Sequence, residues 1–360
     1  MTQLVTVHED HGAVFTEQGG HRIPAHYGRA DRAHLAVRNG VGITEHPFDV
    51  VEITGEDRIE YVDNVVSTRV PADSGHGTYA LLLDPQGRVR LDLYVFTDED
   101  RLYMLLPPGR ADDLLVDWRE KVFIQDVSFE DVTAERLVLG VHGPLATEKL
   151  ASVSTGATLC EERYGFENTT VGEQTAMIVR SDDLAGEEGY FVIADAVDGI
   201  DLFDTLLTRG VGACPFGWET WQTLTLEAGS PLLDSEFEER IPNMLGLRHG
   251  LDFEKGCFVG QEVVSRIENR GQPNQRLVGL FVEAVPTPSA AVCDGDEAIG
   301  EITRGCASPS LDRPIALAMV PFDHDVAALT VRVDGEDVSA TVTALPFQTG
   351  SADSARLPCY

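Results

Sequence analysis

The pattern of hydrophobic residues changes near residue 275, and this change constrains the possible fold more than any other feature of the sequence. Downstream of it, short apolar runs alternate with turn residues. Runs of this length bounded by Gly, Pro, Asn and Asp predict short strands. The predicted strands are 276–283, 298–304, 315–320, 328–333 and 338–344, and residues 286–296 are expected to form a surface loop. The C-terminal part of the chain therefore predicts a small all-β domain.

Upstream of residue 275, strands and helices are mixed. A buried strand over 50–54 precedes a helix that begins with Thr54 and Asp57 in capping-box positions, and "DPQG" turns a hairpin over 79–96. This order of strand, helix, hairpin, strand and helix predicts an α+β layer rather than a doubly wound sheet. The other expected elements are a helical lead-in within 27–43, strands 101–106, 136–143, 175–180 and 189–195, and helices 111–122, 144–153, 196–210, 219–229 and 260–268.

The chain is strongly acidic, with 60 Asp and Glu residues against 27 Lys and Arg and a net charge of -33. The acidic residues are dispersed, and lysine occurs only at positions 121, 149 and 255. Such a surface is typical of proteins from a high-salt cytoplasm, where screening reduces self-repulsion; recruitment of a basic partner is the alternative explanation. The same charge argues against direct nucleic-acid binding through phosphates.

Targeting and metal-binding patterns are missing from the sequence. No apolar run reaches 18 residues and the N-terminus does not resemble a signal peptide, so we expect a cytoplasmic protein that does not enter a membrane. The cysteines show no CxxC or metal-finger spacing, so we expect no metal site and no disulfide framework. They stand at positions 160, 214, 257, 293, 306 and 359.

The stretch "KGCFVGQE", residues 255–262, is the first candidate for chemistry. Cys257 precedes a predicted helix start and lies two residues from Lys255, and both a helix dipole and an ammonium favour thiolate. The competing interpretation is that Cys257 and Phe258 are packing residues at the start of a helix, because no histidine is near enough in sequence to complete a Cys-His pair. Spacing alone favours this second interpretation.

Two carboxylates are further candidates. In "VRLDLYVF" strand alternation places Asp92 on the same face as Arg90 and Tyr94, where it could accept a proton or form an exposed cross-strand salt bridge. In "LAGEEGYF" Glu187 lies in a glycine-bounded turn. It is either solvated or, if buried, able to accept two hydrogen bonds from a flat amino-substituted heterocycle.

Several stretches together resemble the folate-binding superfamily of the glycine-cleavage T-protein, an aminomethyltransferase. They are "EHPFDVVEITGEDRIEYVDNVVSTRV", "GTYALLLDPQGRVRLDL", "LGVHGPLA", "GEEGYF", "LTLEAG" and "IGEITRGCASPSLDRPIALAMV", and they cover nearly the whole chain in order. "KGCFVGQE" and the following "SRIENRGQPNQRLVGL" are similar to the YgfZ-type branch, which acts in iron-sulfur cluster assembly or repair and in tRNA modification.

This resemblance implies three domains around a central channel that holds tetrahydrofolate. Residues 1–275 would form two intertwined α+β domains, one of them over approximately 50–135, and residues 276–360 a β-barrel. Glu187 would hold the pterin edge, Asp92 would stand near the folate nitrogens that carry the one-carbon unit, and Cys257 with Lys255 would face the same channel. The other residues that the resemblance assigns to folate binding are Tyr79, Gly186, Gln261 and Arg266.

Three functions follow from these observations. The first is a YgfZ-type tetrahydrofolate-binding protein in which Cys257 is a functional thiol and iron-sulfur proteins or their assembly factors are partners. The second is an aminomethyltransferase that takes a methylene unit from a lipoylated carrier protein. Leu91 and Thr225 stand where T-proteins have an aspartate and an arginine, which weakens the case for the second. The third is a folate-binding scaffold without chemistry.

Overall fold

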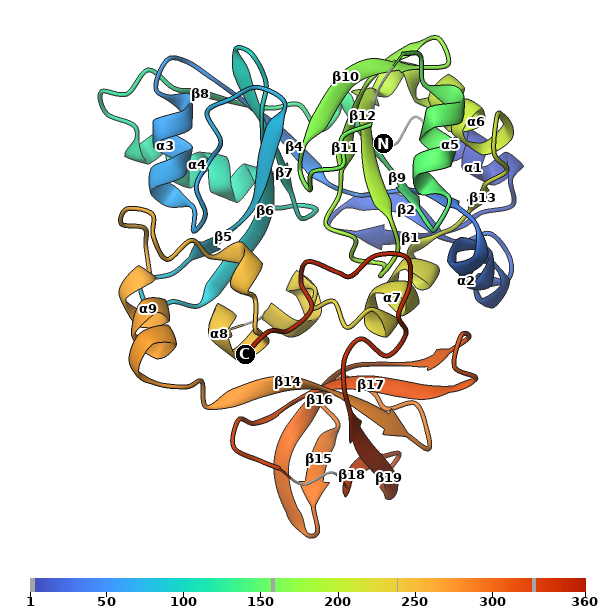
Figure 1. Cartoon of the computed structure of the whole chain (residues 1–360), viewed down its shortest axis with the longest axis vertical. Coiled ribbons are helices and arrows are strands. Elements are labelled where there is room, and N and C mark those ends of the chain that lie inside the picture. The colour runs from blue at the N-terminus through green and yellow to red at the C-terminus, as the bar shows by residue number, and fades with distance from the viewer. Residues whose placement is uncertain (1–3, 157–158, 238, 326–327) are drawn as a thin grey trace.

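The computed structural model describes residues 4–156, 159–237, 239–325 and 328–360. Figure 1 shows two α+β domains side by side and a β-domain against one end of the pair. The predicted α+β class with an all-β C-terminal domain is confirmed. No helix of the described residues is long and apolar enough to cross a membrane.

The first α+β domain contains a sheet with strand order β5-β6-β7-β4-β8. Its elements are β4 (Asp49–Thr54), α3 (Arg58–Val65), β5 (His76–Leu83), β6 (Val89–Thr97), β7 (Arg101–Leu106), α4 (Ala111–Lys121) and β8 (Ser128–Asp131). Strand alternation buries Leu91, Leu93 and Val95 of β6 in one cluster with residues of α3 and α4. The capping box predicted at the start of α3 is wrong, because the Asp57 carboxylate instead accepts a hydrogen bond from the backbone N–H of Asp126.

The second α+β domain contains a sheet with strand order β10-β11-β12-β9-β3-β13. Its strands are β3 (Gly42–Glu45), β9 (Arg136–His142), β10 (Phe166–Val171), β11 (Gln174–Arg180), β12 (Gly189–Asp195) and β13 (Cys214–Pro215). The helices are α1 (Val5–Asp10), α2 (Ala30–Asn39), α5 (Ala146–Val153), α6 (Gly199–Thr208) and α7 (Trp218–Glu227). A hairpin of β1 (Val14–Gln18) and β2 (His21–His26), which the sequence pattern did not predict, joins α1 to α2.

The C-terminal strands form a closed barrel with the order β14-β17-β16-β15-β18-β19. They are β14 (Gln275–Val282), β15 (Ala291–Asp294), β16 (Glu297–Ser308), β17 (Arg313–Pro321), β18 (Ala328–Val333) and β19 (Glu336–Thr343). The expectation that 286–296 is only a surface loop is wrong, because β15 lies within it. Val292 and Cys293 of β15 are buried, and β15 pairs with β16 and β18.

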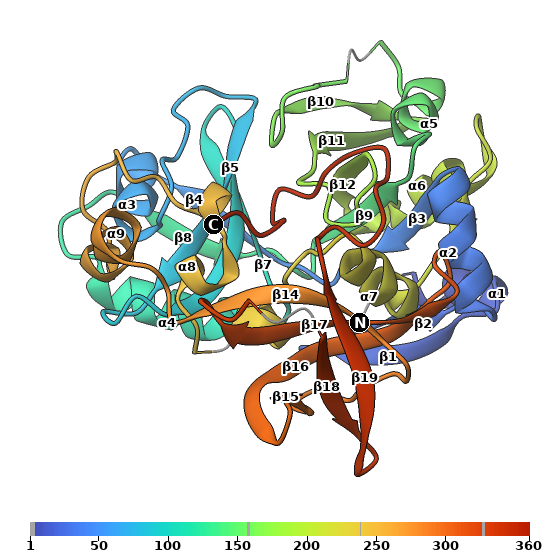
Figure 2. The same cartoon turned by 60° about the horizontal axis from the view of Figure 1, so that its bottom comes forward.

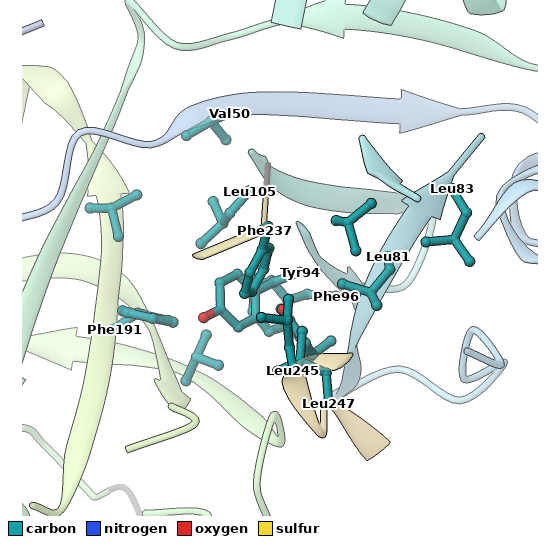
Figure 3. Packing of buried hydrophobic residues seen from close by; sticks show 14 of the residues in the cluster. Val50, Leu81, Leu83, Tyr94, Phe96, Leu105, Phe191, Phe237, Leu245 and Leu247 are labelled. Atoms are coloured by element: carbon teal, nitrogen blue, oxygen red, sulfur yellow. The ribbon is translucent and has the colours of Figure 1, made fainter. Parts of the chain in front are cut away.

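Short helices link the α+β domains to the barrel. They are a π-helical turn η2 (Leu233–Phe237), α8 (Pro242–Leu245), a 3-10 turn η3 (Arg248–Gly250) and α9 (Gln261–Arg270). Phe237, Leu245 and Leu247 from this region join a shared core with side chains from all three parts of the molecule. In Figure 3, Phe237 lies against Tyr94 and Phe96, and Phe191 of the opposite sheet faces the same cluster.

The chain leaves the barrel after β19 and returns to the α+β domains. Residues 344–360, called the C-terminal strap below, run between the two domains (Figure 2). Backbone N–H groups of the strap donate hydrogen bonds to the carbonyl of Asp182 in the second α+β domain, from Ala355, and to that of Gly246 in the linking segment, from Cys359. These backbone hydrogen bonds at Ala355 and Cys359 fix the strap in place between the domains.

Candidate ligand site

A cavity of about 130 Å³ lies at the junction of the two α+β domains, beside the strap. Side chains from β6, from the segment between β3 and β4, from α7, from η2 and from the strap reach it. Among its lining residues are His46, Phe48, Asp92, Tyr94, Trp218, Trp221, Gln222, Asp234 and Arg356. Apolar and aromatic side chains with a few convergent polar groups are the usual lining of a small-molecule site.

Asp92 is the central carboxylate of this cavity. It is 5% exposed, so the exposed salt bridge considered from the sequence is not formed. Its Oδ2 forms an ion pair with Arg356 Nη1 at 2.6 Å and accepts a hydrogen bond from the Tyr79 hydroxyl at 3.4 Å. Its Oδ1 is buried and has no hydrogen-bond partner within the described part of the chain. An unpaired buried carboxylate oxygen is costly, which points to a ligand donor as its partner.

Arg356 has several other contacts in the same place. Its Nη2 donates to the Tyr94 hydroxyl at 2.6 Å, and that hydroxyl donates to Asp182 Oδ2 at 2.6 Å. Arg356 Nε is 3.3 Å from the same Asp182 oxygen. The guanidinium also lies over the Tyr79 ring, 4.4 Å from its centroid. The result is a buried network of one cation, two carboxylates and two phenols.

Burial determines the protonation of this network. Loss of solvation raises the pKa of Asp92, and the positive charge of Arg356 opposes that rise. Burial also raises the pKa of Tyr79 and of Tyr94 well above the ordinary value for tyrosine. Both phenols therefore stay neutral at physiological pH and act as hydrogen-bond donors.

Aromatic side chains form another part of the cavity wall. The His46 and Trp221 rings meet edge to face with centroids 4.7 Å apart, and His46 Nε2 is 3.0 Å from His142 Nε2. Burial lowers the pKa of His46 to about 3, so the imidazole is uncharged at neutral pH. A neutral flat wall of this kind suits a flat aromatic ligand.

Glu187 is buried, but its carboxylate does not line the Asp92 cavity. Its Oε1 accepts from Arg38 at 3.0 Å, and its Oε2 accepts from the backbone N–H and the hydroxyl of Ser351 in the strap, at 2.8 and 2.6 Å. Gly186 precedes it with φ of +72°, a conformation that glycine adopts readily. The turn is therefore closed by the protein's own donors.

Arg38 connects Glu187 to a second buried carboxylate, Glu227 at the end of α7. Glu227 also accepts from His34 at 3.0 Å and from the Ser308 hydroxyl of the barrel. Burial alone would raise the pKa of Glu227, but the hydrogen bond from His34 and the charges around it lower the pKa to about 2. Glu227 thus joins α2, α7 and the barrel and holds the cavity walls together.

"KGCFVGQE" lies away from the Asp92 cavity. The Lys255 ammonium is buried and donates to the backbone carbonyl of Asp63 in the last turn of α3 and to those of Val66 and Thr68 just after it, at 3.0 and 2.8 Å. Cys257 is exposed, whereas Phe258 is buried in the shared core. Lys255 and Phe258 are therefore packing residues, and Cys257 is an accessible thiol.

The remaining sequence candidates divide between these two regions. Tyr79 lies beside Asp92, as described above. The Gln261 amide is 3.4 Å from the Lys255 carbonyl oxygen, and Arg266 pairs with Glu262 on the exposed face of α9. Neither α9 residue lines the Asp92 cavity. No group of three or more His, Cys, Asp or Glu side chains able to hold a metal is found among the described residues.

A second, larger cavity of about 780 Å³ lies between α7, η2 and the barrel. It shares Gln222, Asp234 and Ser235 with the Asp92 cavity, so the two adjoin. Arg304 on its wall donates to the Thr225 hydroxyl at 3.1 Å and to Glu236 at 3.0 Å. Arg304 of β16 thus places a guanidinium beside Thr225, the position at which the resemblance expected an arginine.

Sequence reasoning missed Arg356, Arg304 and the aromatic wall. Arg356 lies far from Asp92 in sequence, in a strap without regular secondary structure, and no local pattern signals such a contact.

Comparisons with known proteins agree with this architecture. The GCVT N-terminal domain family matches residues 4–255, and the glycine cleavage T-protein C-terminal barrel domain matches residues 275–348. The chain belongs to the GCVT family. Within this family, it is 30% identical to the aminomethyltransferase of Symbiobacterium thermophilum, with 96% of each chain covered. It is 32% identical to that of Cutibacterium acnes, covering 96% of this chain and 97% of the relative.

A solved structure shares the fold. The crystal structure of glycine cleavage system aminomethyltransferase T from Bartonella henselae matches with a TM-score of 0.86 and 23% identity, over 98% of each chain. Membership in the GCVT family confirms the superfamily that the sequence resemblance indicated. The two relatives given above are aminomethyltransferases, which agrees with the second functional hypothesis rather than with the YgfZ-type one.

Proposed function

We propose that this GCVT-family chain is a tetrahydrofolate-dependent aminomethyltransferase that moves a one-carbon unit from a lipoylated carrier protein to folate. The observation that carries the proposal is the buried Asp92 carboxylate, which has one oxygen without a partner among the described residues and belongs to a residue that lines the cavity between the α+β domains. The names of relatives aligned over nearly the whole chain support the same activity.

Asp92 supplies the chemistry that such a transfer requires. As folate nitrogens bond to the methylene carbon, its C–S and C–N bonds break, and the N–H protons of folate leave with the lipoyl thiol and ammonia. A carboxylate within hydrogen-bond reach can accept and pass on such a proton. The apolar walls strengthen this interaction by excluding water, and the raised pKa of Asp92 makes it a better base than an exposed aspartate. The neutral hydroxyls of Tyr79 and Tyr94 keep the network hydrogen-bonded without adding negative charge.

The two adjoining cavities suit the two ends of a folate. The flat pterin ring fits the aromatic Asp92 cavity, and the longer tail extends past Gln222 and Ser235 into the larger one. Arg240 and Arg304 line this second cavity and would be the cations available to the tail's carboxylates. Glu187, assigned to the pterin edge by the resemblance, would contact the ring only after releasing Ser351.

Calorimetric titration with tetrahydrofolate in molar potassium chloride tests the ligand. Asp92→Asn should weaken binding at least about tenfold, because it removes the charged acceptor. The matched control is Asp100→Asn, which changes an exposed aspartate on the same domain. Transfer from an aminomethylated lipoyl carrier protein then tests the reaction. A wild-type protein without measurable folate binding would refute the proposal.

A second function retains one specific observation in its favour, the accessible thiol of Cys257 in a stretch similar to the YgfZ-type branch. In that case the cytoplasmic protein would serve iron-sulfur enzymes or their assembly factors. Cys257→Ser distinguishes the two functions. The transferase predicts unchanged folate binding and unchanged aminomethyl transfer, whereas the thiol function predicts unchanged folate binding and lost activity of an iron-sulfur enzyme in cells that rely on the variant.

A further inference from the structure

We infer that Arg356, carried on the C-terminal strap, is a positioning residue of the ligand site: it holds Asp92 by one oxygen so that the other faces the ligand. The identity of the ligand rests on the proposed function, but the arrangement of Arg356 and Asp92 does not. The strap thereby completes a site whose other walls come from the α+β domains.

The geometry of the guanidinium carries the inference. Arg356 is 4% exposed and uses all three of its nitrogens: Nη1 on Asp92, Nε on Asp182 and Nη2 on the Tyr94 hydroxyl. Stacking over the Tyr79 ring restricts the remaining motion. A planar fork held at this many points has one orientation, so it determines the orientation of the carboxylate that it binds.

The consequence is an asymmetric carboxylate. Asp92 Oδ2 is occupied by Arg356 at 2.6 Å, and Asp92 Oδ1 is buried without a partner in the described residues. If Arg356 were lost, the side chain could rotate and satisfy both oxygens within the protein. Arg356 therefore keeps one acceptor of a cavity-lining residue free of protein partners, which is preorganisation by a residue that need not touch the ligand.

Arg356 also decides the charge of the site. Removing it would leave the carboxylates of Asp92 and Asp182 buried together without a cation, and like charges in an apolar environment favour protonation. The titratable and charged groups coupled to Asp92 are Tyr79, Tyr94, Asp182, Asp234 and Arg356. Arg356 is the cation of this set.

The strap could instead be an internal competitor of the ligand. Ser351 occupies Glu187, and Arg356 occupies one oxygen of Asp92, so two residues assigned to folate are bound by the strap. The unpaired Asp92 Oδ1 and the open cavity beside it favour positioning over competition. The two roles predict opposite changes in affinity, which makes them separable.

The test compares Arg356→Met, Arg356→Lys and Asp182→Asn, with the exposed Arg332→Met of the barrel as control. Tetrahydrofolate affinity is measured against pH by calorimetry, and Asp92 ionisation is followed without ligand by carboxyl-selective NMR. Arg356→Met should weaken binding at neutral pH at least about tenfold and move the acid limb to higher pH, because Asp92 becomes easier to protonate. Arg356→Lys should keep most of the wild-type dependence of affinity on pH. Asp182→Asn should move the acid limb of that dependence to lower pH.

Tighter binding by Arg356→Met would show that the strap competes with the ligand and would overturn the inference. An unchanged Asp92 titration in Arg356→Met would do the same. If Arg356→Met does not fold, Asp182→Asn is the deciding variant. In that case, an Asp92 pKa that is not lower in Asp182→Asn than in the wild type would overturn the inference. The ligand-free titration stays informative when no folate binds, so failure of the proposed function is distinguishable from failure of this inference.

Discussion

Lys255→Met should destabilise the protein severely, although its sequence context suggested a role in thiol chemistry. The buried ammonium donates to the carbonyls of Asp63, Val66 and Thr68. These groups lie at the C-terminal end of α3 and just after it, where carbonyls have no partner within the helix and the helix dipole is negative. Methionine keeps most of the apolar stem, so the substitution removes the charged donors and leaves little cavity.

The expected loss follows from this geometry. A hydrogen bond from a charged group contributes about 1.5 to 3 kcal/mol, but three bonds from one ammonium are not independent, and part of the gain offsets the desolvation of the charge. Three buried carbonyls left without donors then give a net loss of about 3 kcal/mol. Against a total stability of roughly 5 to 15 kcal/mol, this is a large fraction.

Denaturant unfolding in molar potassium chloride measures the loss of unfolding free energy. The transition is monitored by a probe of the first α+β domain such as Trp118 fluorescence. Lys121→Met is the matched control, because Lys121 is an exposed partner of Asp117 on α4 and should change stability by less than about 0.5 kcal/mol. A loss below about 1 kcal/mol in Lys255→Met would show that water replaces the ammonium and would refute the role of Lys255 as a helix anchor.

Three further predictions concern charge, acid and thiols. With a net charge of -33, thermal unfolding should shift upward with potassium chloride as the Debye length falls to about 3 Å near 1 M; a flat melting temperature would remove the high-salt explanation. Because the folded pKa of Glu227 is below its ordinary value, its stabilisation is present above about pH 4.5 and lost as the pH falls towards 2, so the stability difference between wild type and Glu227→Gln should shrink over that interval. Limited alkylation with peptide mapping should label Cys257 first, and Cys359 is the other exposed cysteine. Burial raises the pKa of Cys214 and Cys306 to about 11 and 12, so these two should react late. Labelling of Cys214 or Cys306 before Cys257 would contradict the reactive-thiol interpretation.

Local patterns in the sequence determined most of the regular structure. Alternation along β6 and β7 and the "DPQG" turn predicted the hairpin and the next strand, because a strand's two faces and a turn's backbone angles depend on residues close in sequence. The same patterning separated the barrel from the α+β region near residue 275. Patterning was least reliable where partners are distant: it predicted a loop in place of β15, because four residues carry too little periodicity.

The candidate site shows the same division more sharply. The sequence by itself singled out Asp92 and Glu187 as carboxylates of interest and Lys255 as a lysine kept for a task. Only the tertiary structure decided that Arg356 binds Asp92, that Ser351 binds Glu187 and that Lys255 anchors α3. Burial and hydrogen-bond partners depend on which segments meet in space, and these contacts join residues up to 264 positions apart, as between Asp92 and Arg356. No local pattern encodes such a meeting, because its free energy arises from the shared exclusion of water by the whole fold.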